Sequence, residues 1–321
     1  GGIGMSGLAE VMNEMGFNIQ GSDVINSKNV DRCRKNGIKV FIKHSKKNIR
    51  NSIIIVRSSA IGNNNPEIIF AKNKKLKILK RAEMLAHVVS LKKNIVVTGS
   101  HGKTTTTSLI SRILYDSKLD PTIINGGVIN SLENSAKLGK SEWSILESDE
   151  SDGSFVKVPS TYAVVTNIDR EHMDYYSSLN DLKRHFIKFM LKVPSFGKTF
   201  ICIDDKNTRD ICQSSKIKNI LTYGYSNQSN FKIKNCSFQK NKSFFDVEMR
   251  LPNKNKIVLK KFELPLIGSH NIKNATAAIA VSYFIGISPI ILKNSLKNFK
   301  GVERRFNKIF TYNGADIYDD Y

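Results

Sequence analysis

The segment TGSHGKTT (98–105) constrains this 321-residue chain more than any other part of the sequence. It stands between IVVTG (95–99), which is typical of a buried strand, and TTTTSLISRILYDS (104–117), which predicts an amphipathic helix. Backbone N–H groups at a helix start bind phosphate oxygens, so Lys103 is expected at the β- and γ-phosphates and the Thr104 hydroxyl at Mg²⁺. This phosphate loop comprises Gly99, Ser100, His101, Gly102, Lys103, Thr104 and Thr105.

A glycine turn followed by a chance Gly-Lys-Thr is the alternative interpretation of this segment. The order of strand, glycines, lysine, threonine and helix argues against it. One position departs from the general form G-x-x-x-x-G-K, because Val97 stands where its first glycine would be. The loop here has the shorter form G-x-x-G-K-T-T.

The chain opens with a second glycine-rich pattern, GIGMSG (2–7), which matches G-x-G-x-x-G. Such a loop follows a strand, leads into a helix and holds a pyrophosphate. No strand precedes it, so we expect that the sequence begins inside its first βα turn and is a fragment at this end. A helix is expected at 7–16 and a strand at 17–20. Asp23 then follows this strand, where dinucleotide-binding proteins place an acid that contacts a ribose.

Strands and helices alternate along most of the chain. Further strands are expected at 40–42, 53–56, 143–150, 162–168 and 200–204, with helices at 179–191, 271–286 and 288–299, and the segment 77–91 gives a strand and a helix. This alternation predicts an α/β fold with a mostly parallel sheet and helices on both faces. Between about Tyr223 and Leu266 short alternating segments predict a small antiparallel part.

The composition favours an ordinary globular protein. Hydrophobic residues make up 40% of the chain, and no apolar run approaches the ~18 residues of a membrane span. Lys+Arg number 50 against 28 Asp+Glu, but the lysines are dispersed among Asn and Ile, so no nucleic acid partner is expected. Four cysteines without a C-x-x-C pair argue against a zinc site or a disulfide framework. A soluble, cytoplasmic protein is expected.

Nine short blocks together resemble the Mur ligase family, and within it the branch that adds L-alanine to UDP-N-acetylmuramate. They span the whole chain in the family's order: GGIGMSGLAE (1–10), SSAI (58–61), RAEML (81–85), GSHGKTTT (99–106), ESDESDGSF (147–155), NIDREHMD (167–174), GSHNIKNATAAIA (268–280), GVERRF (301–306) and YDDY (318–321). The ESDESDGSF block and the opening loop favour this branch over the later ligases and the murein-peptide ligase.

The resemblance implies an ATP- and Mg²⁺-dependent ligase of peptidoglycan precursor synthesis. In this family ATP phosphorylates a carboxylate, and an amine then displaces phosphate from the acyl phosphate. Lys103 is implied at the phosphates, Thr104 and Glu147 at one Mg²⁺ and His172 at a second. Glu147 ends the strand WSIL, so its carboxylate is expected at the carboxyl edge of the sheet, where ligands bind.

Structural roles remain open for several of these residues. The alternative for Glu147 is a surface acid in an acidic stretch, and Asp149, Glu150 and Asp152 fit that alternative better. A histidine near a strand end is more often structural, and Mg²⁺ prefers oxygen ligands, so the role of His172 depends on the HMD context.

The resemblance places the adenine of ATP at the start of a helix formed by His270, Asn271 and Asn274. The alternative for these residues is helix capping, for which Asn is well suited. Arg305 in GVERRF is implied at the nucleotide phosphates, with Arg304 as the alternative. Asn125 in INGG is expected on a loop near the γ-phosphate.

In the first unit the resemblance implies a Rossmann-like domain (1–92) that binds the uridine and diphosphate of UDP-N-acetylmuramate. The expected contacts are Gly2, Gly4, Ser6, Gly7, Asp23, Ser58 and Ser59. The central ATP-binding domain is expected at 93–312. Residues 313–321 resemble the entry to a third, Rossmann-like domain that closes over ATP, so this domain is expected to be absent and the fragment barely active.

Some Mur ligases carry a carbamylated lysine in the helix after the HMD motif. That position is Phe186 here, and Lys183 and Lys188 are out of register, so no carbamylation is expected. The rival functions are a sibling ligase that adds a peptide, an NAD-dependent oxidoreductase and a nucleic-acid-binding ATPase. An oxidoreductase would leave the phosphate loop and Glu147 unexplained. Oligomeric state and amino-acid selectivity are left open.

Overall fold

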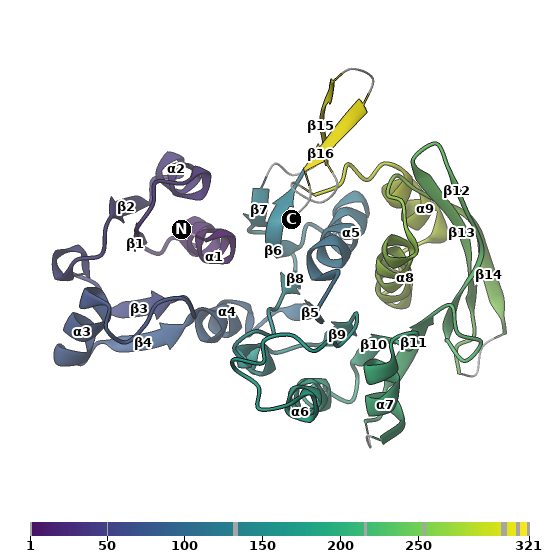
Figure 1. Ribbon diagram of the computed structural model, residues 1–321, viewed down its shortest axis with the longest axis horizontal. Helices are drawn as coiled ribbons and strands as arrows, with labels where there is room; N and C mark the ends of the chain where they lie inside the picture. Colours follow the sequence, from purple (N-terminus) through teal and green to yellow (C-terminus); the bar gives the residue numbers. More distant parts are fainter. Residues whose placement is uncertain are drawn as a thin grey trace.

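One large sheet crosses the centre of the molecule (Figure 1). The structure is a computed structural model that describes residues 2–49, 51–130, 134–214, 217–252, 255–302, 307–312 and 315–319. The strand order is β14-β13-β12-β11-β10-β9-β5-β8-β6-β7. In chain order the strands are β5 (Lys93–Thr98), β6 (Thr122–Ile129), β7 (Asn134–Lys137), β8 (Trp143–Glu147), β9 (Tyr162–Val165), β10 (Lys198–Cys202), β11 (Ile220–Gly224), β12 (Phe231–Gln239), β13 (Lys242–Met249) and β14 (Ile257–Leu264).

Along the sheet, the strands in the order β6, β8, β5, β9, β10, β11 and β12 each run parallel to the next. Antiparallel pairs occur at the two ends, where β7 pairs with β6 and where β12, β13 and β14 pair in turn. The mostly parallel sheet and its smaller antiparallel part are therefore confirmed. The strand β5 has apolar residues on both faces because both faces are covered: Ile95, Val96 and Val97 are fully buried.

Helices cover both faces of this sheet and form two separate cores. On one face Ile95 and Val97 join a core with α5 (Lys103–Asp116), α8 (Ser269–Phe284) and α9 (Pro289–Lys297). On the other face Val96 joins a core with α1 (Ile3–Glu14), α4 (Arg81–Val89), α6 (Leu179–Leu191), α7 (Lys206–Ser214) and the short 3₁₀ helix η2 (Ser154–Lys157).

The first unit contains four strands in two separate parallel pairs. β1 (Gln20–Asp23) pairs with β2 (Lys39–Ile42), and β3 (Ile54–Arg57) pairs with β4 (Lys77–Lys80). Between them lie α2 (Lys28–Lys35), the 3₁₀ helix η1 (Lys46–Ile49) and α3 (Pro66–Asn73). Side-chain oxygens cap the two helices: Ser27 accepts from Val30 N, and Asn65 accepts from Glu67 N ahead of Pro66.

The opening glycines differ from their predicted conformation. The helix α1 begins at Ile3 rather than at Gly7, and Gly2 is its N-cap. Gly7 lies inside the helix and packs closely on β7. A larger residue would not fit there, because a Cβ on Gly7 would lie 2.8 Å from Ala136 Cβ. The strand predicted at 17–20 is also wrong in position, since the observed strand β1 begins only at Gln20.

An ion pair between α1 and α2, together with a hydrogen bond from the same arginine, connects the first unit to the edge of the large sheet. Glu10 on α1 is 1% exposed, and its Oε1 accepts a 2.7 Å hydrogen bond from Arg32 Nε on α2. Arg32 Nη2 also donates to Ser135 Oγ on β7 at 3.1 Å. These contacts fix α1, and with it the opening glycines, against the hairpin β6–β7.

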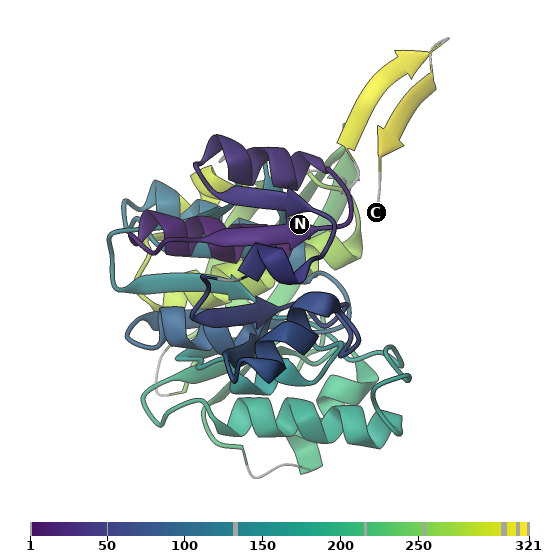
Figure 2. The same ribbon diagram turned by 90° about the vertical axis from the view of Figure 1, so that its left-hand side faces the viewer.

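The last described strands, β15 (Asn307–Tyr312) and β16 (Ala315–Asp319), form an antiparallel hairpin that projects away from the rest of the molecule (Figure 2). Cys33, Cys202, Cys212 and Cys236 are free cysteines. Within the described ranges, no helix has both the length and the apolar character needed to cross a membrane.

Candidate active site

The phosphate loop connects β5 to α5 through two glycines with positive φ. Gly99 has φ 133° and Gly102 has φ 80°, conformations that glycine adopts without strain. Both positions are also closely packed. A Cβ on Gly99 would lie 2.2 Å from Thr166 Oγ1, and a Cβ on Gly102 would lie 2.5 Å from Asn274 Oδ1. The two glycines are therefore required for both conformation and space.

The segment after β9 fixes the backbone of the phosphate loop. Ser100 N donates to Asn167 O at 3.1 Å, and His101 N donates to Asn167 Oδ1 at 2.8 Å. The side chains of Thr166 and Asn167 both donate to His101 O. The carboxyl ends of the parallel strands β5 and β9 are thus joined, where ligands bind in open α/β sheets.

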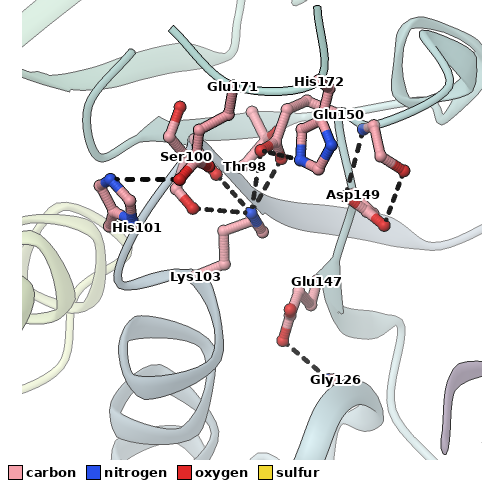
Figure 3. A network of polar contacts seen from close by, with 12 residues as sticks. Thr98, Ser100, His101, Lys103, Gly126, Glu147, Asp149, Glu150, Glu171 and His172 are labelled. Carbon is pink, nitrogen blue, oxygen red and sulfur yellow. Dashed lines mark hydrogen bonds and ion pairs between the residues drawn. The ribbon is translucent and has the colours of Figure 1, made fainter. Parts of the chain in front are cut away.

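Lys103 is the first residue of α5, and its ammonium group turns back over its own loop (Figure 3). Nζ donates to Gly99 O at 2.6 Å and to Ser100 O at 3.0 Å. Its third contact is the carboxylate of Glu150, with Oε1 at 3.2 Å and Oε2 at 2.8 Å.

Thr104 and Glu147 meet at the point where the sequence predicts a metal site. Thr104 Oγ1 donates to Glu147 Oε1 at 3.1 Å, and Gly126 N donates to Glu147 Oε2 at 2.7 Å. Burial raises the pKa of Glu147, while the Gly126 N–H and the nearby Lys103 oppose that rise. A hydroxyl and a carboxylate beside a phosphate loop are the oxygen ligands that Mg²⁺ prefers.

Glu150 is part of this site, although the sequence favoured a surface position for it. Its side chain is fully buried, and burial raises its pKa. His172 Nε2 lies 3.5 Å from Glu150 Oε1, and His172 has a left-handed backbone with φ 57°. One oxygen or nitrogen each from Asp149, Glu150 and His172 lie within 4.8 Å of one another, which is close enough to hold a metal ion.

The predicted adenine site lies at the first turns of α8. The N-cap of this helix is Gly268 rather than an asparagine, so the capping alternative is wrong for Asn271. Asn271 Nδ2 donates to Ile267 O at 2.8 Å. Asn274 is buried against Gly102, so this helix touches the phosphate loop directly. His270 lies on the same turn.

The first glycine loop lies beside an arginine that the sequence reasoning did not single out. A Cβ on Gly4 would lie 3.2 Å from Arg81 Nη1, at the start of α4. Arg81 follows β4 directly. A cation at the carboxyl end of a strand is the sequence feature that could have indicated this position beside the glycine loop. Ser6 is buried and donates to Gly2 O at 3.1 Å, so its hydroxyl is engaged within the helix.

The other residues predicted to contact UDP lie at strand ends of the first unit. Asp23 ends β1 and accepts from Ile25 N, while Ser58 and Ser59 follow β3. At the ends of β3 and β4, a cavity of about 280 Å³ is lined by Arg57, Lys72, Lys80 and Glu83 among other residues.

Two ion pairs connect this unit to the ESDESDGSF segment and η2. Lys80 Nζ lies 3.7 Å from Asp152 Oδ2, and Lys157 Nζ lies 2.7 Å from Glu83 Oε1. The acidic segment therefore lies between the two loops.

Arg304 and Arg305 fall outside the described residues. Asn125 is buried on β6, where its Nδ2 donates to Ser108 Oγ and Gly127 O.

Comparison with known proteins gives one consistent result. The family model "Mur ligase family, catalytic domain" matches residues 1–93, and the model "Mur ligase middle domain" matches residues 97–282. A UDP-N-acetylmuramate–L-alanine ligase of Pelagibacter ubique is 63% identical over 321 residues, which is all of this chain and 69% of the relative. A ligase of the same name from Brucella anthropi is 43% identical over the same share of each chain.

Solved structures agree with these matches. UDP-N-acetylmuramate–alanine ligase MurC from Thermotoga maritima superposes with a TM-score of 0.86 at 27% identity, covering 100% of this chain and 72% of that one. A murein-peptide-type ligase from Neisseria meningitides has a TM-score of 0.84 at 23% identity, covering 95% and 97%, which shows a shared fold. With these matches along its whole length, the chain belongs to the Mur ligase family.

Proposed function

We propose that this chain carries the ATP-dependent ligation of L-alanine to the carboxylate of UDP-N-acetylmuramate, a step of peptidoglycan precursor synthesis. The 63% identity to a ligase of that name, over every residue of this chain, is the observation that carries the proposal. The comparisons do not favour the peptide-adding sibling or the oxidoreductase. ATP binds at the second loop, which leaves the first loop for the UDP group.

The reaction proceeds in two steps. An oxygen of the substrate carboxylate bonds to the γ-phosphorus of ATP, the bond to the bridging oxygen breaks, and ADP leaves. The amine of alanine then bonds to the acyl carbon, the carbon–oxygen bond to phosphate breaks, and the amine loses a proton. Both steps depend on positioning and on charge neutralisation more than on a protein nucleophile.

Residues at the carboxyl ends of the parallel strands provide this positioning and charge neutralisation. The N–H groups at the start of α5 bind phosphate oxygens, and Lys103 reaches the β- and γ-phosphates. Thr104 and Glu147, 3.1 Å apart, would hold Mg²⁺, which neutralises charge on the transferred phosphoryl group when bound. The first turns of α8, where Asn274 packs against Gly102 and Asn271 lies one helical turn away, would receive the nucleotide base.

In the first unit, Gly2 and Gly4 at the start of α1 allow close approach of a diphosphate, and Arg81 adds positive charge beside Gly4. Gly7 packs on β7 and takes no part in this contact. Asp23, Ser58 and Ser59 complete the surroundings of the uridine. We divide the chain near residue 92 into a UDP-binding and an ATP-binding unit, and we place the reaction in the cytoplasm, where free thiols persist.

The test measures ADP formation with UDP-N-acetylmuramate, ATP and Mg²⁺. Because the chain spans 69% of its relative, both this chain and a fusion to the remaining segment of that relative are assayed. ADP release that requires both UDP-N-acetylmuramate and L-alanine supports the proposal. Equal ADP release with either substrate omitted rejects it, and faster turnover with a peptide than with alanine would indicate the sibling ligase.

A further inference from the structure

The ammonium group of Lys103 directs its hydrogen bonds to the protein itself. Its partners are Gly99 O, Ser100 O and the Glu150 carboxylate, at 2.6, 3.0 and 2.8 Å for the nearer oxygen. An ammonium group has three N–H donors. Lys103 therefore cannot reach a phosphate without giving up at least one of these partners.

Glu150 is the fixed partner of this ion pair. Its backbone oxygen accepts hydrogen bonds from the Tyr176 hydroxyl and from Gly153 N, and Tyr176 is 1% exposed. The Glu150 side chain is fully buried. Lys103, by contrast, has a four-carbon stem and is 15% exposed, so the lysine is the residue that moves.

A buried carboxylate needs a compensating charge or hydrogen-bond donors. Among the described residues, Lys103 contacts Glu150 as a cation, and the imidazole of His172 lies 3.5 Å from it. When Lys103 leaves, the His172 ring is the remaining partner. Glu150 therefore contacts both Lys103, which is proposed at the phosphates, and His172, which the sequence predicts at a second metal ion.

We propose that Glu150 is a positioning residue that competes with the phosphates of ATP for Lys103, and that ATP binding transfers Lys103 from Glu150 to the phosphates. Glu150 then orients the His172 ring, because a histidine that binds a metal ion through one nitrogen is held through the other. This inference rests on the proposed function.

Three variants separate this exchange from simple charge repulsion. Glu150→Gln keeps the shape but weakens the hold on Lys103, and Glu150→Asp keeps the charge but withdraws the carboxylate by one methylene. Glu142→Gln makes the same chemical change at an exposed acid that pairs with Lys93, and it serves as the control for nucleotide binding. Thermal melting establishes that each variant folds.

The first readout is the Kd of ATP without Mg²⁺, measured by equilibrium dialysis. We expect Glu150→Gln to bind ATP about tenfold more tightly than the wild type, equivalent to about 1.4 kcal/mol. Glu150→Asp should change in the same direction, and Glu142→Gln should stay within about twofold of the wild type. The second readout is kcat with Mg²⁺, which should fall in Glu150→Gln because His172 loses its orientation.

Failure of the exchange differs from failure of the proposed function. If Lys103→Ala binds ATP as the wild type does, the phosphate loop is not the ATP site. If Lys103→Ala loses ATP binding while Glu150→Gln and Glu150→Asp bind no more tightly than the wild type, only the exchange is overturned. Tightening in Glu150→Gln and Glu142→Gln alike, without tightening in Glu150→Asp, would reduce the effect to a change in net charge and also overturn the exchange.

Discussion

The Thr104 hydroxyl donates a 3.1 Å hydrogen bond to Glu147 Oε1, which joins the first turn of α5 to the carboxyl end of β8. Both groups offer oxygen atoms of the kind that Mg²⁺ prefers, and we propose them as its ligands. Glu147→Gln should therefore lower kcat by about 10²–10³-fold and raise the Mg²⁺ concentration needed for half-maximal rate. Ligation rates across a Mg²⁺ series provide the measurement. Glu142→Gln, an exposed acid paired with Lys93, is the control, and equal losses in both variants would contradict the metal site.

Gly102 combines a left-handed backbone with close packing against Asn274. Gly102→Ala should lower the free energy of unfolding and abolish measurable ATP binding, because the added methyl displaces either the loop or α8. Gly37→Ala is the matched control, since Gly37 has the same φ of 80° and nothing within 4 Å of its Cβ position. That variant should lose only about 1–2 kcal/mol, from backbone strain alone. Urea unfolding and ATP dialysis of the two variants separate strain from crowding.

Glu248 on β13 lies among three cations, and the resulting pH dependence has a definite sign. Its carboxylate lies within 3.2 Å of Lys256, Lys234 and Arg250, and chiefly the Lys256 hydrogen bond lowers its pKa from 4.5 to about 2. A carboxyl whose pKa falls on folding stabilises the fold above its unfolded pKa and loses that effect as pH falls to the folded pKa. The Tm difference between wild type and Glu248→Gln should be full above about pH 4.5 and vanish towards pH 2. A constant difference would contradict the ion-pair origin.

The ion pair between Glu10 and Arg32 should contribute to the free energy of unfolding. Arg32→Met leaves the buried Glu10 carboxylate without its cation and should lower the free energy of unfolding by about 2–3 kcal/mol, since Arg32 is partly exposed. The double variant with Glu10→Gln should recover part of this loss because no uncompensated charge remains. Urea unfolding of the four proteins gives the coupling energy, and a coupling near zero would show that the pair contributes nothing.

Much of the parallel sheet could be predicted because local signals coincide there with tertiary structure. The helix predicted at 179–191 matches α6 at both ends, where Ser178 accepts from Asp181 N as an N-cap and the apolar residues fall on one face. The phosphate loop was predicted for the same reason. Its glycines, lysine and threonine lie between a buried strand and a helix, and this order requires no information from distant residues.

The rest depended on contacts that are distant in sequence. The strand β6 was missed because INGG reads as a turn, although Gly126 is needed there to donate to Glu147. The helices α2 and α7 were missed because their apolar positions are few. The helix α3 was missed because its apolar residues are consecutive, from Ile68 to Ala71, and show no helical period. Glu150 looked exposed within an acidic run, and its burial follows from Tyr176 and Lys103, far away in the chain. Asn274 was predicted near adenine, while its contact with Gly102 arises only when α8 packs beside α5.

The helices α1 and α4 share one apolar core with the central sheet and α6. The two glycine loops are consequently parts of one cooperative structure, and their separation is set by folding. A sugar nucleotide anchored by its diphosphate at the first loop must have the right reach to present a carboxylate at the second. Molecular length thus becomes a criterion for choosing the substrate, alongside the chemistry of its groups.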